Sequence, residues 1–175
     1  MKRLILMRHA KSSWSEEDTD DHARPLNARG QAAAARMGLF LKQRGILPQA
    51  VICSTAQRTC ETLNLVLEAA GITPCVIHDR QIYLAMPEQM IGVAIEHLQR
   101  DAPTSDCAMI LGHNPGTHAL ALALAKSGDP QKIRALNMKY PTGAVTVIEC
   151  DTDTWEGVVR GGRLMEFALP REIDA

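Results

Sequence analysis

The sequence has no long apolar run, and this excludes the usual export and membrane-spanning segments. The basic start Met1-Lys2-Arg3 is followed by an apolar stretch that stops after Met7. That stretch is too short for a secretory signal or a transmembrane helix. The 175 residues suit one domain. We therefore expect a cytoplasmic protein in which residues 1–175 form a single domain.

An excess of positive charge is also missing. The chain has 19 Lys and Arg against 20 Asp and Glu, so its formal net charge at pH 7 is −1. No overall positive field would draw it to nucleic acid or to an anionic membrane. We expect neither as a partner, and we expect a monomer. Any site for an anion must be built locally.

The sequence has no cysteine pair at metal-binding or redox spacing. Its five cysteines are odd in number, and none forms a CxxC pair. Four of them lie in or beside apolar, strand-like segments, where reduced cysteine behaves as a small hydrophobe. This favours a reducing compartment and argues against a disulfide framework or a zinc site. No Walker P-loop or GxGxxG motif occurs either. We therefore predict no metal and no cofactor.

Short apolar runs alternate with helical patterns along most of the chain. Strands are predicted at residues 4–7, 50–53, 75–78 and 108–111. A helix is expected after each strand, because apolar residues recur there at helical spacing. These apolar stripes are Ala33, Met37, Phe40 and Leu41; Leu63, Val66, Leu67 and Ala70; Ile91, Ala94, Ile95 and Leu98; and Leu120, Ala123 and Leu124.

Capping residues mark where these helices begin and end. Asn27 is a suitable N-cap for the first helix, and Asn114 for the fourth, with Pro115 as its first residue. Pro87 is suited to open the third helix. Gly45 and Gly71 are placed to end the first and second helices.

The order of elements predicts an α/β fold. Alternating strands and helices form right-handed crossovers, so we expect a three-layer α/β/α sandwich with a mostly parallel central sheet. The end of the chain differs, because residues 143–149 and 155–167 are both rich in strand-forming residues. With residues 151–154 as the turn, they predict a C-terminal antiparallel edge hairpin.

Cationic and ionisable residues follow three of the predicted strands. Arg8 and His9 follow the first strand, Arg58 lies just beyond the second, and His113 follows the fourth. Ligands of open α/β sheets bind beyond the carboxyl ends of the strands, so these side chains should meet at one edge. Guanidinium groups match phosphate oxygens in shape and charge. A neutral histidine can attack phosphorus, and a protonated one can donate to a phosphoryl oxygen. The pattern predicts a phosphoryl site that needs no metal.

Six motifs in order resemble those of the histidine phosphatase superfamily, and within it the SixA-type phosphohistidine phosphatases. They are LILMRHAKSSW at 4–14, RPLNARG at 24–30, CSTAQRTCET at 53–62, IYLA at 82–85, GHNPG at 112–116 and PTGAVTVIE at 141–149. The resemblance implies that His9 is the nucleophile and forms a phosphohistidine intermediate. It implies that Arg8 and Arg58 clamp the phosphoryl group, and that His113 contacts the phosphoryl oxygens.

The chain departs from many relatives that act on phosphate esters, because it lacks a glutamate in the loop at residues 82–87. An alkoxide leaving group needs a proton from a general acid. A phosphorylated imidazole with a protonated ring instead departs as neutral imidazole. The departure therefore favours a phosphohistidine substrate over an ester. Glu88 remains a possible general acid, as does a member of the acidic cluster Glu16, Glu17, Asp18, Asp20 and Asp21.

The function expected from these residues is removal of a phosphoryl group from phosphohistidine on a protein. Arg24 belongs to the second motif; it either orders the long loop at residues 11–27 or reaches the phosphate. Two alternatives stay open: a small-molecule phosphomonoesterase or mutase of the same superfamily, and a non-catalytic module that binds phosphohistidine. Such a module would not need the nucleophile His9.

Overall fold

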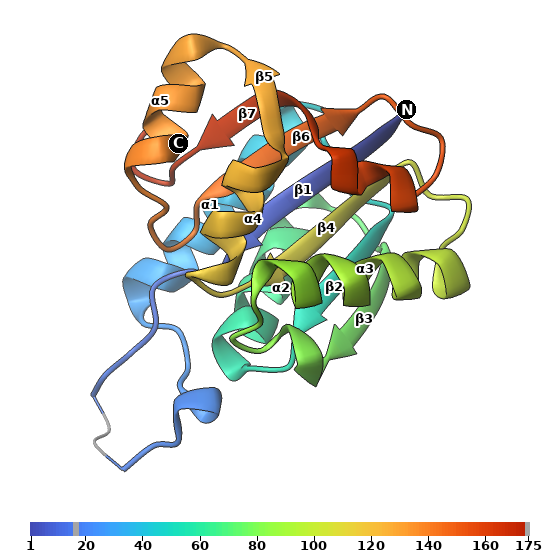
Figure 1. Cartoon of the computed structure of the whole chain (residues 1–175). Helices are drawn as coiled ribbons and strands as arrows, with labels where there is room; N and C mark the ends of the chain where they lie inside the picture. The colour runs from blue at the N-terminus through green and yellow to red at the C-terminus, as the bar shows by residue number, and fades with distance from the viewer. Residues whose placement is uncertain (16–17, 174–175) are drawn as a thin grey trace.

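The computed structural model describes residues 1–15 and 18–173, which form a mixed seven-stranded sheet with helices on both faces (Figure 1). The strands are β1 (Lys2–Arg8), β2 (Ala50–Ser54), β3 (Cys75–Asp79), β4 (Cys107–Gly112), β5 (Ala125–Gly128), β6 (Val145–Cys150) and β7 (Gly162–Ala168). The helices are α1 (Ala28–Gln43), α2 (Gln57–Ala70), α3 (Pro87–Asp101), α4 (Gly116–Leu124) and α5 (Pro130–Met138). Three short 3₁₀ helices are η1 (Asp21–Ala23), η2 (Arg80–Ile82) and η3 (Glu156–Arg160). Across the described residues, no helix combines the length and apolar character that crossing a membrane requires.

The four strands expected in the first two thirds of the chain form the parallel part of the sheet. The sheet order is β3-β2-β4-β1-β6-β7-β5, and β3, β2, β4 and β1 run in the same direction. Arg8 at the end of β1 lies opposite Gly112 at the end of β4. Cys53, one residue before the end of β2, lies opposite Leu111. The carboxyl ends of three strands therefore meet at one edge, as expected.

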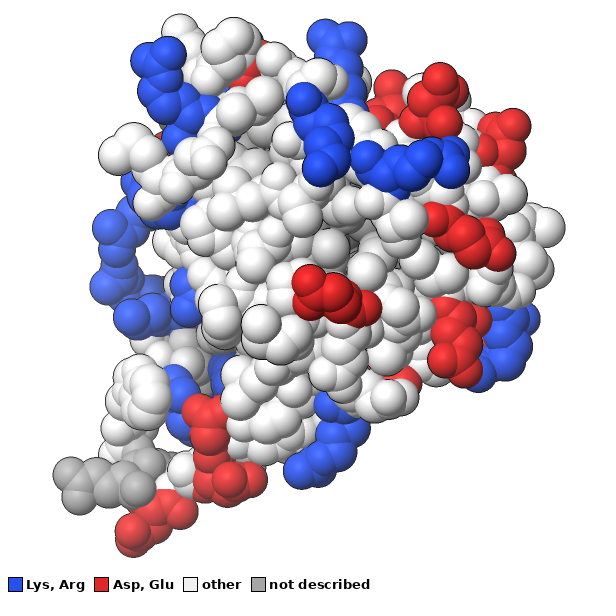
Figure 2. Space-filling view, in the orientation of Figure 1, with Lys and Arg blue, Asp and Glu red and all other residues white. Residues whose placement is uncertain are grey.

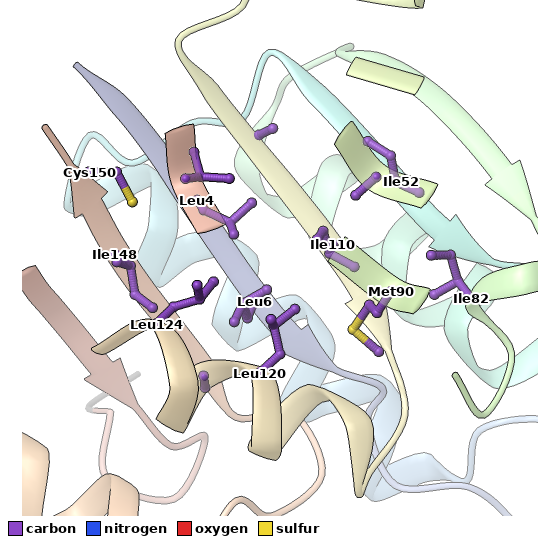
Figure 3. Close-up of a cluster of buried hydrophobic side chains, with 14 of the residues drawn as sticks. Leu4, Leu6, Ile52, Ile82, Met90, Ile110, Leu120, Leu124, Ile148 and Cys150 are labelled. Carbon is purple, nitrogen blue, oxygen red and sulfur yellow. The ribbon is translucent and has the colours of Figure 1, made fainter. Parts of the chain in front are cut away.

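Both faces of the sheet are covered by helices, which confirms the layered α/β arrangement. Side chains of a strand alternate between the two faces. Leu4 and Leu6 of β1 accordingly pack toward α3 and α4, as Figure 3 shows, while Ile5 and Met7 pack toward α1 and α2. All four are fully buried. Burial of each such side chain contributes about 1.5–3 kcal/mol to folding, so β1 is firmly anchored directly before Arg8.

Most of the predicted helix ends are confirmed. The side chain of Asn27 accepts a hydrogen bond of 2.8 Å from the backbone N–H of Gly30 at the start of α1. Gly71 ends α2 in the left-handed conformation, at a φ of 70°. Gly45 has a φ of 65° just after α1. Pro87 is the first residue of α3.

The predicted cap of α4 is wrong. The helix begins at Gly116, and no side chain caps it. The amide of Asn114 instead donates to the carbonyl oxygen of Tyr140 at 2.9 Å, because the turn after β4 is tied to the loop before β6. The stripe of α4 is also shifted, since Ala121 is buried while Ala123 is exposed.

The C-terminal hairpin forms, with elements around it that the sequence pattern did not predict. β6 and β7 pair antiparallel, but β6 also pairs antiparallel with β1, so it lies inside the sheet. The first part of residues 155–167 forms η3 rather than strand. β5 pairs in parallel with β7 and occupies the sheet edge. Its sequence, AKSG, has no alternating apolar pattern to reveal it.

Candidate active site

A pocket of about 240 Å³ lies at the edge where the parallel strands end. Its lining residues are Arg8, His9, Lys11, Ser12, Trp14, Arg24, Arg58, Leu84, His113, Asn114 and Thr142. The structure therefore brings together the two arginines and two histidines that the sequence analysis singled out, although they come from distant parts of the chain.

Arg8 is held at the end of β1 by the loop that precedes β6. Its Nη1 donates to the carbonyl oxygen of Tyr140 at 3.0 Å, the same oxygen that accepts from Asn114. Burial, and then the positive charge of Arg58, lower the pKa of Arg8. A guanidinium nevertheless keeps its proton in proteins. Arg8 and Arg58 are therefore both permanent cations within one small pocket.

The ring of His9 is oriented with one nitrogen free for chemistry. Its Nδ1 lies 2.7 Å from the carbonyl oxygen of Ala10. A carbonyl can only accept, so Nδ1 carries the hydrogen and Nε2 of the neutral ring carries the lone pair. Burial lowers the pKa of His9 to about 4, with further lowering by Arg58 and Arg8. At neutral pH His9 is thus an uncharged base whose lone pair lies on Nε2.

His113 is also held as a neutral ring. Its Nδ1 lies 3.3 Å from Nη2 of Arg58, which can only donate, so Nε2 carries the hydrogen and donates to Ser54 Oγ at 2.7 Å. Burial, then the charges of His9 and Arg58, lower the pKa of His113 to about 3. The centres of the two rings are 5.3 Å apart. A bound dianion would favour protonation of this ring.

The carboxylate of Asp21 is the counter-charge of the site. Arg58 donates to the backbone oxygen of Asp21 at 2.5 Å and to Oδ2 at 3.1 Å, and Arg24 donates to Oδ1 at 2.8 Å. The hydroxyl of Tyr83 donates to Oδ2 at 2.5 Å. The hydrogen bond from Tyr83, followed by those from Arg24 and the charge of Arg58, lowers the pKa of Asp21 to about 2. Asp21 is therefore ionised at neutral pH and has no proton to donate.

Arg24 orders the loop that closes one side of the pocket. Its Nε donates to the backbone oxygen of Ser13 at 3.1 Å, and its Nη2 donates to the hydroxyl of Ser12. Its guanidinium carbon lies 3.3 Å from the centre of the Trp14 ring. Of the two roles considered for Arg24, loop ordering is visible in these contacts. Arg24 also lines the pocket.

The comparisons with known proteins agree with this geometry. Residues 4–82 match the model of the histidine phosphatase superfamily (branch 1). An uncharacterized protein of Mycobacterium tuberculosis is 34% identical over 168 residues, which are 94% of this chain and 100% of that protein. The chain belongs to the histidine phosphatase superfamily. This membership implies phosphatase or mutase activity.

Two further relatives extend the likeness. An uncharacterized chloroplastic protein of Arabidopsis thaliana is 36% identical over 142 residues; the match spans 78% of this chain but 64% of that protein. The crystal structure of a SixA protein from Agrobacterium tumefaciens superposes with a TM-score of 0.76 at 25% identity, over 97% of this chain and 98% of that one. The fold of this superfamily member is therefore that of SixA proteins.

The carboxyl groups considered as general acids do not, where the structure describes them, place a proton in the pocket. Glu88 is exposed in the first turn of α3 and does not line the pocket. Of the acidic cluster, Glu16 and Glu17 lie outside the described residues. Asp21 does enter the site, but as the ionised partner of Arg58. Among the residues that the structure describes, none offers a carboxylic acid proton inside the pocket.

Three residues position the site without having been assigned that role from the sequence: Ser54, Tyr83 and Asp21, of which Asp21 was considered only as a general acid. Ser54 fixes the ring of His113, and the Tyr83 ring stands edge-on to it at 5.3 Å. Ser54 could have been found, because it is the last residue of β2, directly after the predicted strand at residues 50–53, at the edge where His113 arrives. For Asp21 the available signal is its position three residues before Arg24, within ion-pair reach.

One cluster outside the pocket has metal-ligating side chains. The ligand atoms of Cys53, Cys60 and His78 all lie within 4.8 Å of one another, the sole such group found in the described part of the chain. The three residues come from β2, α2 and β3, so no CxxC spacing announces them. A hydrogen bond between the thiols raises the pKa of Cys53 and lowers that of Cys60 to about 7. None of the three lines the pocket.

Proposed function

We propose that the protein removes the phosphoryl group from a phosphohistidine side chain of another protein, without a metal. The observation that carries this proposal is His9: its Nδ1–H is bound by the Ala10 carbonyl, and its free Nε2 lies in a pocket with Arg8 and Arg58. A neutral nucleophile that needs no base is combined there with two fixed positive charges. Such charges stabilise an anionic phosphoryl group in transfer.

The reaction has two steps. In the first, Nε2 of His9 bonds to phosphorus while the N–P bond of the substrate breaks, and the substrate ring leaves as neutral imidazole. In the second, water attacks phosphorus, the bond to His9 breaks and inorganic phosphate is released. Arg8 and Arg58 hold the phosphoryl oxygens through both steps. His113, which the incoming dianion helps to protonate, donates to one of them.

The state of the carboxyl groups supports phosphohistidine over an ester. An alkoxide has a parent acid with a pKa on the order of 15–16, as for water, and leaves only if protonated. Asp21 is ionised down to a pKa of about 2, and Glu88 does not line the pocket. A free imidazole has a pKa near 6.5 and leaves without further help once its ring is protonated.

The test is a panel of substrates with trapping of the intermediate. Phosphoimidazole and a phosphohistidine peptide should have a higher kcat/KM than a set of phosphate esters, including sugar phosphates. Acid-labile phosphate should be trapped on the wild-type protein and be absent from His9→Ala. A higher kcat/KM for esters would favour the phosphomonoesterase or mutase alternative. Binding of the peptide without turnover would favour a non-catalytic module.

A further inference from the structure

A second and larger hollow adjoins the catalytic pocket. It has a volume of about 630 Å³ and lies between α1, the loop before β6 and the C-terminal residues 169–172. Its charged lining residues are Arg8, Lys11, Arg29, Arg36, Lys139, Arg171 and Glu172. We call this hollow the cationic groove. Because Arg8, Lys11 and Thr142 line both spaces, the groove is continuous with the catalytic pocket.

The groove concentrates positive charge on a protein whose net charge is −1. Six cationic side chains face one carboxylate there. Figure 2 shows blue Lys and Arg side chains gathered along the left edge of the molecule, where α1 begins in Figure 1. Close like charges repel, and net stabilisation requires an anion among them.

The described residues provide little negative charge to pair with these cations. Within the described residues, the side chains of Lys11 and Arg29 have no hydrogen bond or ion pair. Arg36 donates to a neutral acceptor, the carbonyl of Pro170, at 2.9 Å. The contact of Lys139 with Glu172 is 3.9 Å long, and both side chains are more than 60% exposed. Such an exposed pair is screened by water and neutralises the groove only weakly.

The position of Arg29 is unfavourable for folding alone. It is the second residue of α1, and the first turn of this helix contains no acidic residue. The amino end of a helix carries partial positive charge, so a cation is disfavoured there. An exposed arginine without a partner at this position is better explained by a ligand than by stability.

The opposite rim of the catalytic pocket is apolar, which bears on the kind of anion. Trp14 and Leu84 line that pocket, yet they are 74% and 52% exposed. Aromatic residues and arginines that flank one site are typical of protein interfaces. A small phosphorylated metabolite would fill the 240 Å³ pocket and leave both flanks uncovered. A protein surface would cover both.

We propose that the cationic groove binds acidic side chains of the protein that presents the phosphohistidine. This inference rests on the proposed function and extends it, since it assigns how the substrate is selected. Arg29 and Arg36 are seven residues apart on α1, about 10 Å along the helix. The partner should therefore carry at least two carboxylates spread over a similar length beside its phosphohistidine.

The test compares two synthetic phosphohistidine peptides that differ only in charge. One carries Glu on both sides of the phosphohistidine, and the other carries Gln at the same positions. Wild-type protein should prefer the Glu peptide in kcat/KM by about tenfold at low salt, because several exposed ion pairs add up. The preference should shrink at high salt, where charges are screened. In Arg29→Glu it should disappear or reverse, and Arg29→Lys should retain most of it.

Arg163→Glu is the matched control. Arg163 is an exposed residue of β7 in register with Glu149, which pairs with Arg3 at the opposite end of β1 from Arg8. Arg8 lies five positions after Arg3 along the strand, a distance of about 16 Å. The control makes the same change in net charge and should keep the wild-type preference. Turnover of phosphoimidazole, which carries no acidic side chain that could pair with Arg29, should be the same in Arg29→Glu and wild type.

Binding of the unphosphorylated peptides, measured by calorimetry, tests the groove proposal separately from the proposed phosphatase function. The groove is supported if wild type binds the Glu peptide more tightly than the Gln peptide and Arg29→Glu does not. If phosphoimidazole is not hydrolysed, the proposed function is wrong, whatever the peptides do. If it is hydrolysed and wild type does not distinguish the peptides, the groove proposal is overturned. A sugar bisphosphate whose KM alone rises in Arg29→Glu would assign the groove to a metabolite and also overturn it.

Discussion

The depressed pKa of His9 leads to a quantitative prediction about stability. Burial lowers the pKa of His9 from 6.5 to about 4 in the folded protein. Between these two values the unfolded chain binds a proton that the folded protein does not. The free energy of unfolding therefore decreases as pH falls below 6.5, and this decrease reaches its full size only below pH 4.

The size of the effect follows from linkage. At pH 5 the unfolded imidazole is almost fully protonated, and the folded one is about a tenth protonated, which costs about 2 kcal/mol of unfolding free energy. At pH 7 the same cost is about 0.2 kcal/mol. Replacement of His9 by Asn removes the titration but leaves a side chain that can donate to Ala10. The stability of His9→Asn relative to wild type should therefore improve by about 2 kcal/mol from pH 7 to pH 5.

Urea unfolding at both pH values measures this change, and His97→Asn serves as a control of opposite sign. Burial works against protonation of His97, but its hydrogen bonds to Asp79 and Asp101 prevail, and its pKa is raised. Its protonation stabilises the fold at low pH, and that stability is lost as pH rises through the folded pKa. His97→Asn should thus become relatively less stable at pH 5. If His9→Asn and wild type lose stability equally on acidification, His9 is not held neutral as the structure indicates.

Three further outcomes are expected. Arg58→Ala should lower kcat/KM for phosphoimidazole by about 10²–10³-fold or more, as for loss of a preorganised donor; a near-normal rate would contradict the clamp. Ser54→Ala leaves the buried Nε2–H of His113 without its acceptor, so unfolding experiments should show a loss of about 1–3 kcal/mol. Asp21→Asn should lower the melting temperature of the free protein, because Arg58 loses its charged partner. It should also tighten vanadate binding, because the carboxylate no longer competes with the anion for Arg58. Weaker vanadate binding would count against this reasoning.

The parallel part of the sheet and its helices could be predicted because their signals are local. Each strand there contains a short apolar run in the sequence, and Asn27 and Gly71 act within a few residues of their own positions. β5 could not be predicted, since four residues with two exposed polar side chains form a strand only because β7 offers an unpaired edge. The role expected of Asn114 failed for a related reason. Its amide is engaged by Tyr140, a residue that no local pattern connects to it.

In the site, too, residues placed by local signals could be predicted, and residues placed by long-range contacts could not. Arg8, His9 and His113 could be placed together because each stands at or just after the carboxyl end of a strand, where topology decides the location. Asp21 lies in a run of acidic residues, and apart from its spacing of three residues from Arg24 nothing in that run indicates which carboxylate turns inward. Tyr83 could be placed no better, because its role is set by its hydroxyl contact with Asp21 across 62 positions of sequence.

The placement of Asp21 follows from the electrostatics of a site that must exist before its substrate arrives. The side chain of Arg58 is almost fully buried and shares the pocket with the charge of Arg8. A buried charge without a partner is strongly destabilising. The carboxylate of Asp21, held by Tyr83 as well as by both Arg24 and Arg58, supplies that partner in the free protein. Three of the five N–H groups of Arg58 are engaged in the free protein, two by Asp21 and one by Nδ1 of His113. In the proposed function, a phosphoryl group binds the remaining N–H groups of Arg58 or competes with Asp21 for the others. In the proposed function, the loop that carries Asp21 is therefore part of the binding equilibrium, and every hydrogen bond to Asp21 that the phosphoryl group replaces lowers its net affinity for Arg58.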